Sequence, residues 1–206
     1  MKKIGIVNYS LGNVGSVASA LSFYGQDIRL IDSASGLADV DAIVLAGVGN
    51  FKTAVDKINA LKLREAIHEQ VIEKKKPVLG VCLGMQLFAD SSTEGGDIPG
   101  FGWIEGKVEQ IEGEDLRLPH IGWNDIVPVG SELFDGMRGR TFYFMHSYHF
   151  RPVDPSVVIA TTRYHDAELV SAVKKDNIVG VQFHPEKSQG DGLRFLRNFL
   201  ESINRA

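Results

Sequence analysis

Short, mostly apolar runs of strand length recur along the first half of the chain. They are Ile4 to Val7, Ile28 to Ile31, Ala42 to Ala46 and Val78 to Val81. Apolar runs of four or five residues bounded by turn signals are typical of strands buried in a sheet. We therefore expect four early strands in the core of the protein.

Segments with helical spacing separate these runs. One extends from about Asn13, whose side chain could cap it, to Tyr24, and Gly25 ends it. Another, Lys62 to Glu73, is amphipathic and should cover one face of the sheet. The alternation of strands with helices predicts a parallel, doubly wound α/β sheet.

The second half of the chain has a different pattern, in which alternation and turns replace most helices. Strands are expected at Val108 to Ile111, Ile121 to Val127, Phe142 to Tyr148, Val157 to Thr161, Leu169 to Val173 and Ile178 to Phe183. A last helix, about Gly190 to Ile203, has apolar residues at helical spacing: Leu196, Phe199, Leu200 and Ile203. The whole pattern predicts a largely parallel central sheet flanked by helices, with an antiparallel extension in the second half.

A dinucleotide-binding fold shares this rhythm of strands and helices. Its first strand-to-helix turn carries the phosphate-binding pattern G-x-G-x-x-G, whereas the turn from Asn8 to Gly15 reads NYSLGNVG. We therefore do not expect a nucleotide cofactor.

The composition is that of one globular domain, and the negative net charge argues against a nucleic-acid partner. The 206 residues are 44% hydrophobic and 23% charged, with a formal net charge of -4. We expect one domain over residues 1–206 and no nucleic-acid partner. No apolar run reaches membrane-spanning length, and the residues before the first strand are too few for a signal peptide, so the expected location is the cytoplasm, with no membrane association. The one cysteine cannot form an intrachain disulfide, which agrees with a reducing compartment.

That cysteine, Cys82, lies between the strand Val78 to Val81 and the helix expected next. Gly80 and Gly84 flank it in the order G-x-C-x-G, the spacing of a nucleophile elbow, where small neighbours allow a tight strand-to-helix turn. The positive end of the following helix favours a thiolate. The alternative is a small buried hydrophobic residue, as most lone cysteines in cytosolic proteins are.

A general base with an orienting carboxylate is predicted near the other end of the chain. His184 and Glu186 follow the strand expected at Ile178 to Phe183, and in an extended chain they project to the same side. Pro185 limits that strand to an end or an edge. A lone histidine is more often structural, but Cys82, His184 and Glu186 together supply a nucleophile, a base and a carboxylate that orients the base.

The chain resembles the class I (triad) glutamine amidotransferases over essentially its whole length. In that family a G-x-C-x-G-x-Q elbow and a late H-P-E supply the triad, here Cys82, His184 and Glu186. Further stretches look like the glutaminase subunit of imidazole glycerol phosphate synthase: Asn8-Tyr9, Gly12-Asn13, Gly122-Trp123-Asn124, Phe142 to Tyr148 and Gln182 to Ser188. The resemblance implies an α/β, flavodoxin-like fold.

It also implies hydrolysis of the glutamine side-chain amide without a metal or an organic cofactor. The residues implied to bind L-glutamine or its oxyanion are Gly47, Gly49, Leu83, Gln86, Glu94, Ser147 and Tyr148. Gly47 and Gly49 lie in a loop that relatives usually begin with proline. This chain has Ala46 there, which puts the rigidity of the loop in doubt.

Two histidines raise the question of a metal. His146 and His149 are three residues apart, and odd spacing in an extended strand places them on opposite faces. No zinc site has its full ligand set in this stretch, so we expect no metal and a structural role for His149.

The resemblance finally implies a partner, a (β/α)8-barrel cyclase subunit that uses the ammonia in histidine biosynthesis as part of a heterodimer. Such a barrel takes about 250 residues, so it must be a separate chain. Two alternatives stay open. One is a glutaminase or thiol hydrolase of the same triad family that serves another pathway, and the other is a catalytically silent domain that only docks a partner.

Overall fold

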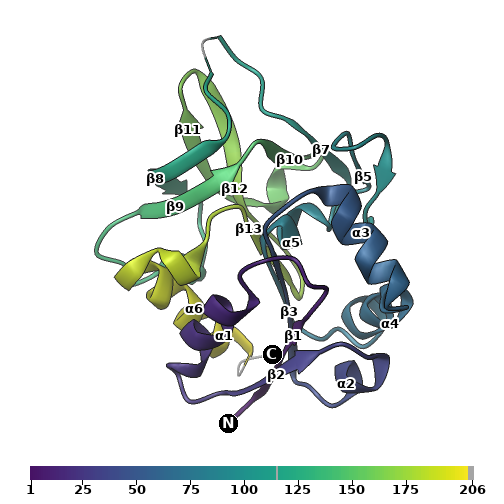
Figure 1. Cartoon of the computed structure of the whole chain (residues 1–206). Helices are drawn as coiled ribbons and strands as arrows, with labels where there is room; N and C mark the ends of the chain where they lie inside the picture. The colour runs from purple at the N-terminus through teal and green to yellow at the C-terminus, as the bar shows by residue number, and fades with distance from the viewer. Residues whose placement is uncertain (115, 204–206) are drawn as a thin grey trace.

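The computed structural model describes residues 1–114 and 116–203. The main sheet has the strand order β2-β1-β3-β4-β13-β12-β11-β8-β9 (Figure 1). Its strands are β1 Lys3–Val7, β2 Asp27–Ile31, β3 Ala42–Gly47, β4 Val78–Cys82, β8 His120–Pro128, β9 Thr141–His146, β11 Val158–Tyr164, β12 Ala167–Lys175 and β13 Ile178–Val181. A smaller sheet has the order β10-β7-β5-β6, from β5 Ser91–Ser92, β6 Ile98–Pro99, β7 Gly106–Gln110 and β10 Tyr148–Pro152.

The parallel half of the main sheet has flavodoxin-like topology. Strand β1 pairs in parallel with β2 and β3, and β4 pairs in parallel with β3 and β13. Numbered along the chain, these five strands lie in the order 2-1-3-4-5, which is that of flavodoxin-like sheets. The remaining pairs, from β13 through β12, β11 and β8 to β9, are antiparallel. The fold class predicted from the sequence is therefore confirmed.

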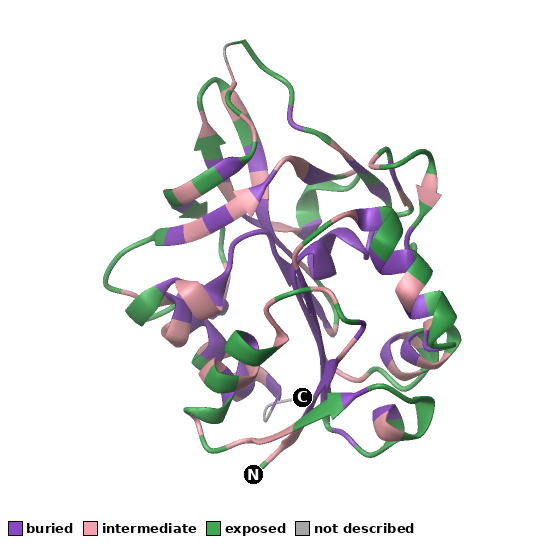
Figure 2. Ribbon diagram, in the orientation of Figure 1, coloured by how far each residue is buried: buried purple, intermediate pink, exposed green. Residues whose placement is uncertain are grey.

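Helices cover both faces of the parallel strands (Figure 1). Helices α1 Val14–Ser22 and α6 Gln189–Ile203 lie on one face, and α2 Ala34–Ala38, α3 Phe51–Ala60 and α4 Arg64–His68 lie on the other. Strand side chains alternate between two apolar cores: Ile43 and Leu45 of β3 belong to the core under α3, and Val44 to the core under α6. Strands β1, β3, β4 and β13 are buried almost throughout, whereas the edge strand β2 is partly exposed (Figure 2). Among the described residues, no helix is both long enough and apolar enough to cross a membrane.

Helix α3 was not predicted from the sequence, although its apolar residues have helical spacing. Phe51, Ala54, Val55 and Ile58 are all buried at helical spacing. Asn50 caps the helix, since its side-chain oxygen accepts a hydrogen bond from the Thr53 N–H at 3.0 Å. The segment was missed because it follows the glycine-rich loop directly.

The helix expected over Lys62 to Glu73 begins two residues later and changes its type. Lys62 has φ +55, a left-handed conformation that a helix cannot contain, so α4 begins at Arg64. A wider π-helical turn, Glu69–Glu73, continues it. Ile67 and Val71 are buried on its inner face, as the amphipathic pattern required.

Two expected strands have different limits. The segment Phe142 to Tyr148 divides at Ser147 into β9 and β10, which belong to different sheets. The strand expected over Ile178 to Phe183 ends at Val181, where the chain bends out of the sheet. Both breaks occur where the chain enters the region around Cys82.

Candidate active site

Cys82 is the last residue of β4 and directly precedes the short helix α5 Leu83–Gln86. Its backbone has φ 53 and ψ -109, a conformation that is rare for a residue with a side chain. Such backbone strain is typical of the nucleophile in a strand-to-helix elbow. The predicted turn is therefore present, and it is tighter than expected because strand and helix meet directly at Cys82 and Leu83.

The elbow requires both flanking glycines. A Cβ atom on Gly84 would lie 1.7 Å from the backbone oxygen of Leu45, and one on Gly80 would lie 2.5 Å from the Phe88 ring and 2.7 Å from Gly84 itself. Neither position can accept a methyl group without moving backbone or a core ring. The spacing of these glycines around Cys82 thus has a steric cause.

His184 and Glu186 form a buried pair. His184 Nδ1 lies 2.9 Å from Glu186 Oε1, and their side chains are 1% and 0% exposed. The prediction of an extended segment is wrong, because Pro185–Lys187 forms a 3-10 turn. Pro185 favours this turn, since proline suits the first position of a helical turn. The two side chains meet across the turn.

Asn13 supports the carboxylate and does not cap its helix. It occupies the N-cap position of α1 with φ 42, but its side chain makes no capping bond. The Asn13 side-chain amide donates to Glu186 Oε1. The possible capping role is therefore wrong, because the Asn13 backbone is left-handed where a capping residue is extended, and the amide is turned towards Glu186.

The thiol and the imidazole are electrostatically coupled. His184 Nε2 is buried and makes no hydrogen bond of ordinary geometry with the residues that the structure describes. Burial lowers the pKa of His184, but interaction with Cys82 and then Glu186 outweighs it and raises the pKa to about 10. At neutral pH the imidazole is therefore protonated, and a cation beside a cysteine favours its thiolate.

Gln182 also reaches the sulfur. Its Nε2 donates to Cys82 Sγ at 3.5 Å, and its Oε1 accepts from Gln86 Nε2 at 3.1 Å. The sequence reasoning did not single out this residue as part of the site. A signal was available, because Gln182 is two residues before His184 within the same motif.

A cavity of about 200 Å³ opens beside Cys82. It is lined by Gly49, Cys82, Leu83, Gln86, Glu94, Pro119, Met145, His146, Ser147 and Tyr148. Six of the seven predicted substrate-binding residues are in this lining. The seventh, Gly47, stands opposite Cys82 in the pairing of β3 with β4 and packs against the Tyr9 ring. The structure thus brings the predicted residues together around one small cavity.

Hydrogen bonds fix two of these lining side chains. Gln86 is buried and donates to the Tyr148 backbone oxygen at 2.8 Å, so it is not the solvent-facing helix residue of the alternative interpretation. Glu94 Oε2 accepts from the Phe51 N–H at the start of α3 at 2.7 Å. Burial raises the pKa of Glu94, and the bond from Phe51 opposes the shift.

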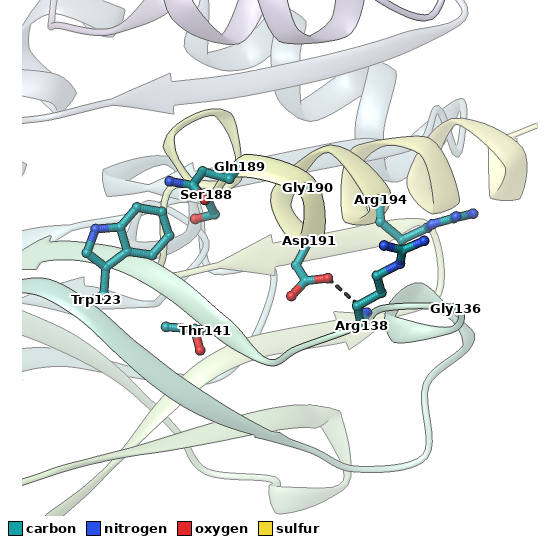
Figure 3. A pocket seen from close by; sticks show the side chains of 9 residues that line it. All are labelled: Trp123, Gly136, Arg138, Thr141, Ser188, Gln189, Gly190, Asp191 and Arg194. Carbon is teal, nitrogen blue, oxygen red and sulfur yellow. Dashed lines mark hydrogen bonds between the residues drawn. The ribbon is translucent and has the colours of Figure 1, made fainter.

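A larger cavity, of about 640 Å³, lies at the start of α6 (Figure 3). Trp123, Arg138 and Arg194 are among its lining residues. The Asp191 carboxylate accepts backbone hydrogen bonds from Arg138 at 3.1 Å and Gly139 at 3.0 Å. None of the three triad residues lines this cavity, so the smaller one is the candidate active site.

No group of three or more His, Cys, Asp or Glu side chains within residues 1–114 and 116–203 is arranged to hold a metal ion. His146 and His149 lie on two different strands, β9 and β10, so the argument from one extended strand does not apply. His146 bonds to His120, whereas His149 Nδ1 is buried without a partner.

Comparison with known proteins assigns the chain to a family. The family described as glutamine amidotransferase class-I matches residues 15–203, and the chain belongs to this family. Among solved structures, a crystal structure of a glutamine amidotransferase superposes with a TM-score of 0.77 at 21% identity, covering 98% of each chain. The structure of PurLQS from Thermotoga maritima gives a TM-score of 0.73 at 19% identity, covering 98% of this chain and 100% of that one.

Within the family, similar sequences include subunits of imidazole glycerol phosphate synthase. The imidazole glycerol phosphate synthase subunit HisH of Pelagibacter ubique is 43% identical over 203 residues, covering 95% of this chain and 97% of the relative. HisH of Pyrococcus furiosus is 44% identical over 201 residues, covering 97% and 98%. These relatives match the chain over nearly its whole length.

Proposed function

We propose that this chain is the glutaminase subunit of an imidazole glycerol phosphate synthase, acting in histidine biosynthesis. The observation that carries the proposal is the array of Cys82, His184 and Glu186, of which Cys82 lines one small cavity, in a chain that is 43% and 44% identical to two HisH subunits. The reaction is hydrolysis of L-glutamine to glutamate and ammonia.

The charges at the site suit this reaction. The Cys82 thiolate attacks the carboxamide carbon, and the protonated His184 gives its proton to the departing ammonia as the C–N bond breaks. The product is a glutamyl thioester on Cys82. The neutral imidazole then takes a proton from a water molecule, which attacks the thioester, and release of glutamate regenerates the thiolate and the imidazolium. Glu186, bonded to His184 Nδ1, orients the ring and stabilises its charge.

Two backbone segments are placed to stabilise the tetrahedral oxyanion. Leu83 begins α5 directly after the nucleophile, where helix N–H groups lack partners within the helix. Gly49 lies across the cavity with φ 139, a conformation that glycine adopts readily. The lining residues Gln86, Glu94, Ser147 and Tyr148 would hold the rest of the substrate.

Ammonia has to reach a second active site. We infer that a (β/α)8-barrel cyclase, bound to this chain in a heterodimer, contains that second site. An exposed apolar stripe on β8 suits such a partner. Ile121, Trp123 and Val127 are 58%, 49% and 58% exposed, and they alternate along one side of the strand. We place this complex in the cytoplasm, where a reducing compartment keeps the single thiol free.

The test uses the complex of this chain with the cyclase, and compares wild type with Cys82→Ala. In the variant, turnover with glutamine should fall to background, while turnover with an added ammonium salt should persist because only ammonia production is removed. Glutamine-driven turnover that survives the substitution would refute the assignment of Cys82. If the wild-type complex uses ammonium but not glutamine, the chain is a docking domain and not a glutaminase.

A further inference from the structure

A chain of hydrogen bonds connects the surface of β8 with the wall of the active-site cavity. Asn124 Nδ2 lies 3.2 Å from His120 Nε2, and His120 Nδ1 lies 3.0 Å from His146 Nε2. His146 Nδ1 in turn lies 2.9 Å from the backbone oxygen of Tyr148. Both histidines are buried, and the mechanism above uses neither of them.

The acceptor at the inner end sets the position of every proton in this chain. The Tyr148 carbonyl can only accept, so His146 Nδ1 carries a hydrogen. In a neutral ring His146 Nε2 is then an acceptor, which requires a hydrogen on His120 Nδ1. His120 Nε2 is therefore an acceptor as well, and it receives the hydrogen bond from Asn124.

Asn124, at the outer end, independently gives the same donor-to-acceptor direction for these hydrogen bonds. The Asn124 amide cannot be turned over, because its Nδ2 also donates to the Arg163 oxygen at 2.9 Å and its Oδ1 accepts from the Asp125 N–H at 2.8 Å. Only two neutral rings with Nδ1–H satisfy all these atoms. Burial lowers the pKa of His120 to about 4 and that of His146 to about 3, which agrees with neutral rings.

The inner end of the chain lies in the wall of the cavity. His146, Ser147 and Tyr148 line it, and the Tyr148 oxygen also accepts from Gln86. The wall crosses from β9 to β10 at Ser147, a residue that belongs to neither strand. The backbone of this segment pairs with β7, through the Ile111 N–H that donates to the Ser147 oxygen at 2.9 Å and through the pairing of Tyr148 with Gln110. The bond from His146 adds a second support from the side of β9.

We propose that His120 and His146 are positioning residues, which hold the Ser147–Tyr148 wall in the arrangement that binds glutamine. This rests on the proposed glutaminase function. Both rings have the same tautomer, with the hydrogen on Nδ1. The hydrogen bonds all point the same way, with Asn124 as the first donor and the Tyr148 oxygen as the last acceptor. A change of the Asn124 amide at the strand surface is thereby transmitted to the substrate site.

Asn124→Asp in the complex with the cyclase is the sharpest test, because it replaces a donor by an acceptor at a partly exposed site. The carboxylate can only accept, so it favours the His120 tautomer with the hydrogen on Nε2. His120 Nδ1 then has no hydrogen to donate, and the bond to His146 is lost or reversed. We expect the KM for glutamine to rise about tenfold, the effect of one buried hydrogen bond to a protein group. The kcat with glutamine and the turnover with ammonium should stay within about twofold of wild type. Asn124→Ala, which adds no acceptor, should raise KM less.

The tautomers can be observed directly. Nitrogen-15 NMR of the imidazoles should show Nδ1–H for His120 and His146 in wild type, and Nε2–H or a doubly protonated ring for His120 in Asn124→Asp. His120→Phe is a second variant, since a phenyl ring can stack between Phe144 and Tyr164 as His120 does. It should also raise KM and spare ammonium-driven turnover. The matched control is His149→Phe, a buried histidine outside the chain, which should leave KM unchanged.

Three results would overturn the inference: an unchanged KM in Asn124→Asp and His120→Phe, Nε2–H rings in wild type, or a parallel loss of glutamine-driven and ammonium-driven turnover. The last result would mean that the histidines only maintain the fold. A wild-type complex that does not use glutamine contradicts the proposed function instead, so the two failures are distinguishable.

Discussion

The buried hydroxyl of Tyr9 is expected to lower the stability of the fold, and removing this hydroxyl gives a quantitative test. Its side chain is 1% exposed, and its hydroxyl makes no hydrogen bond to any described residue. Burial raises the pKa of Tyr9, and the nearby Cys82 adds to the shift, as expected for a hydroxyl withdrawn from water. The ring packs tightly, since a Cβ on Gly47 would lie 2.4 Å from the Tyr9 oxygen.

Tyr9→Phe keeps the ring and removes only the unpaired hydroxyl. Leaving a buried donor unpaired costs about 1–3 kcal/mol, so the variant should be more stable by roughly that amount. For a chain of this length, about 1 kcal/mol corresponds to 2–4 °C in the melting temperature. We therefore expect a rise of about 2–12 °C, measured by differential scanning calorimetry and checked by urea unfolding.

Tyr24→Phe is the matched control. The Tyr24 hydroxyl donates to the Leu193 oxygen at 2.7 Å, so the same substitution removes a formed hydrogen bond. It should lower the unfolding free energy by about 1 kcal/mol. If Tyr9→Phe destabilises the protein as Tyr24→Phe does, the Tyr9 hydroxyl has a partner and the reasoning is wrong.

Substitutions at the elbow, in the triad and in the histidine chain give three further tests. Gly84→Ala places a methyl group 1.7 Å from a β3 carbonyl and should cost about 3 kcal/mol in urea unfolding, whereas Gly15→Ala, with no atom within 4 Å, should add about 0.5–1 kcal/mol. Glu186→Gln should retain measurable glutaminase activity, because the carboxylate acts through the imidazole, and His184→Ala should not; equal losses would give the carboxylate a larger role. The pKa of His120 is 6.5 in the unfolded chain and about 4 in the folded protein, so the unfolded chain binds the proton more tightly. The protein should therefore lose about 2 kcal/mol of unfolding free energy between pH 7 and pH 5 through this residue. His120→Phe should remove that part of the pH dependence of stability.

The parallel sheet and the elbow were predictable because their signals are local. Buried strands are short apolar runs, and the spacing of Gly80 and Gly84 around Cys82 is a local signal of a tight strand-to-helix turn, although the atom that excludes a Cβ at Gly84 belongs to the neighbouring strand β3. The order of the parallel strands followed from resemblance, since strand spacing alone does not distinguish one doubly wound order from another.

The supports of the site were not predictable, because they join residues far apart in sequence. Asn13 is 173 positions from the Glu186 that it contacts, and His120 is 26 positions from His146. Local rules gave a possible helix cap for the first, considered His146 only together with His149, and assigned no role to His120. The His184 and Glu186 pairing was expected for the wrong reason, since alternation along a strand was assumed where a 3-10 turn forms.

In the segment Ala46 to Gly49, tertiary packing supplies the rigidity that its own sequence lacks. Ala46 does not fix the backbone as a proline would, but it is 1% exposed and pairs with β4. Beyond it, Gly47 is confined by the Tyr9 ring, and a Cβ on Gly12 would lie 3.2 Å from the Val48 Cβ. The β1–α1 segment therefore packs along the outer side of this loop, and its Asn13 amide reaches Glu186. One segment thus supports both the loop and the triad, so a displacement of it would alter oxyanion stabilisation and imidazole orientation together.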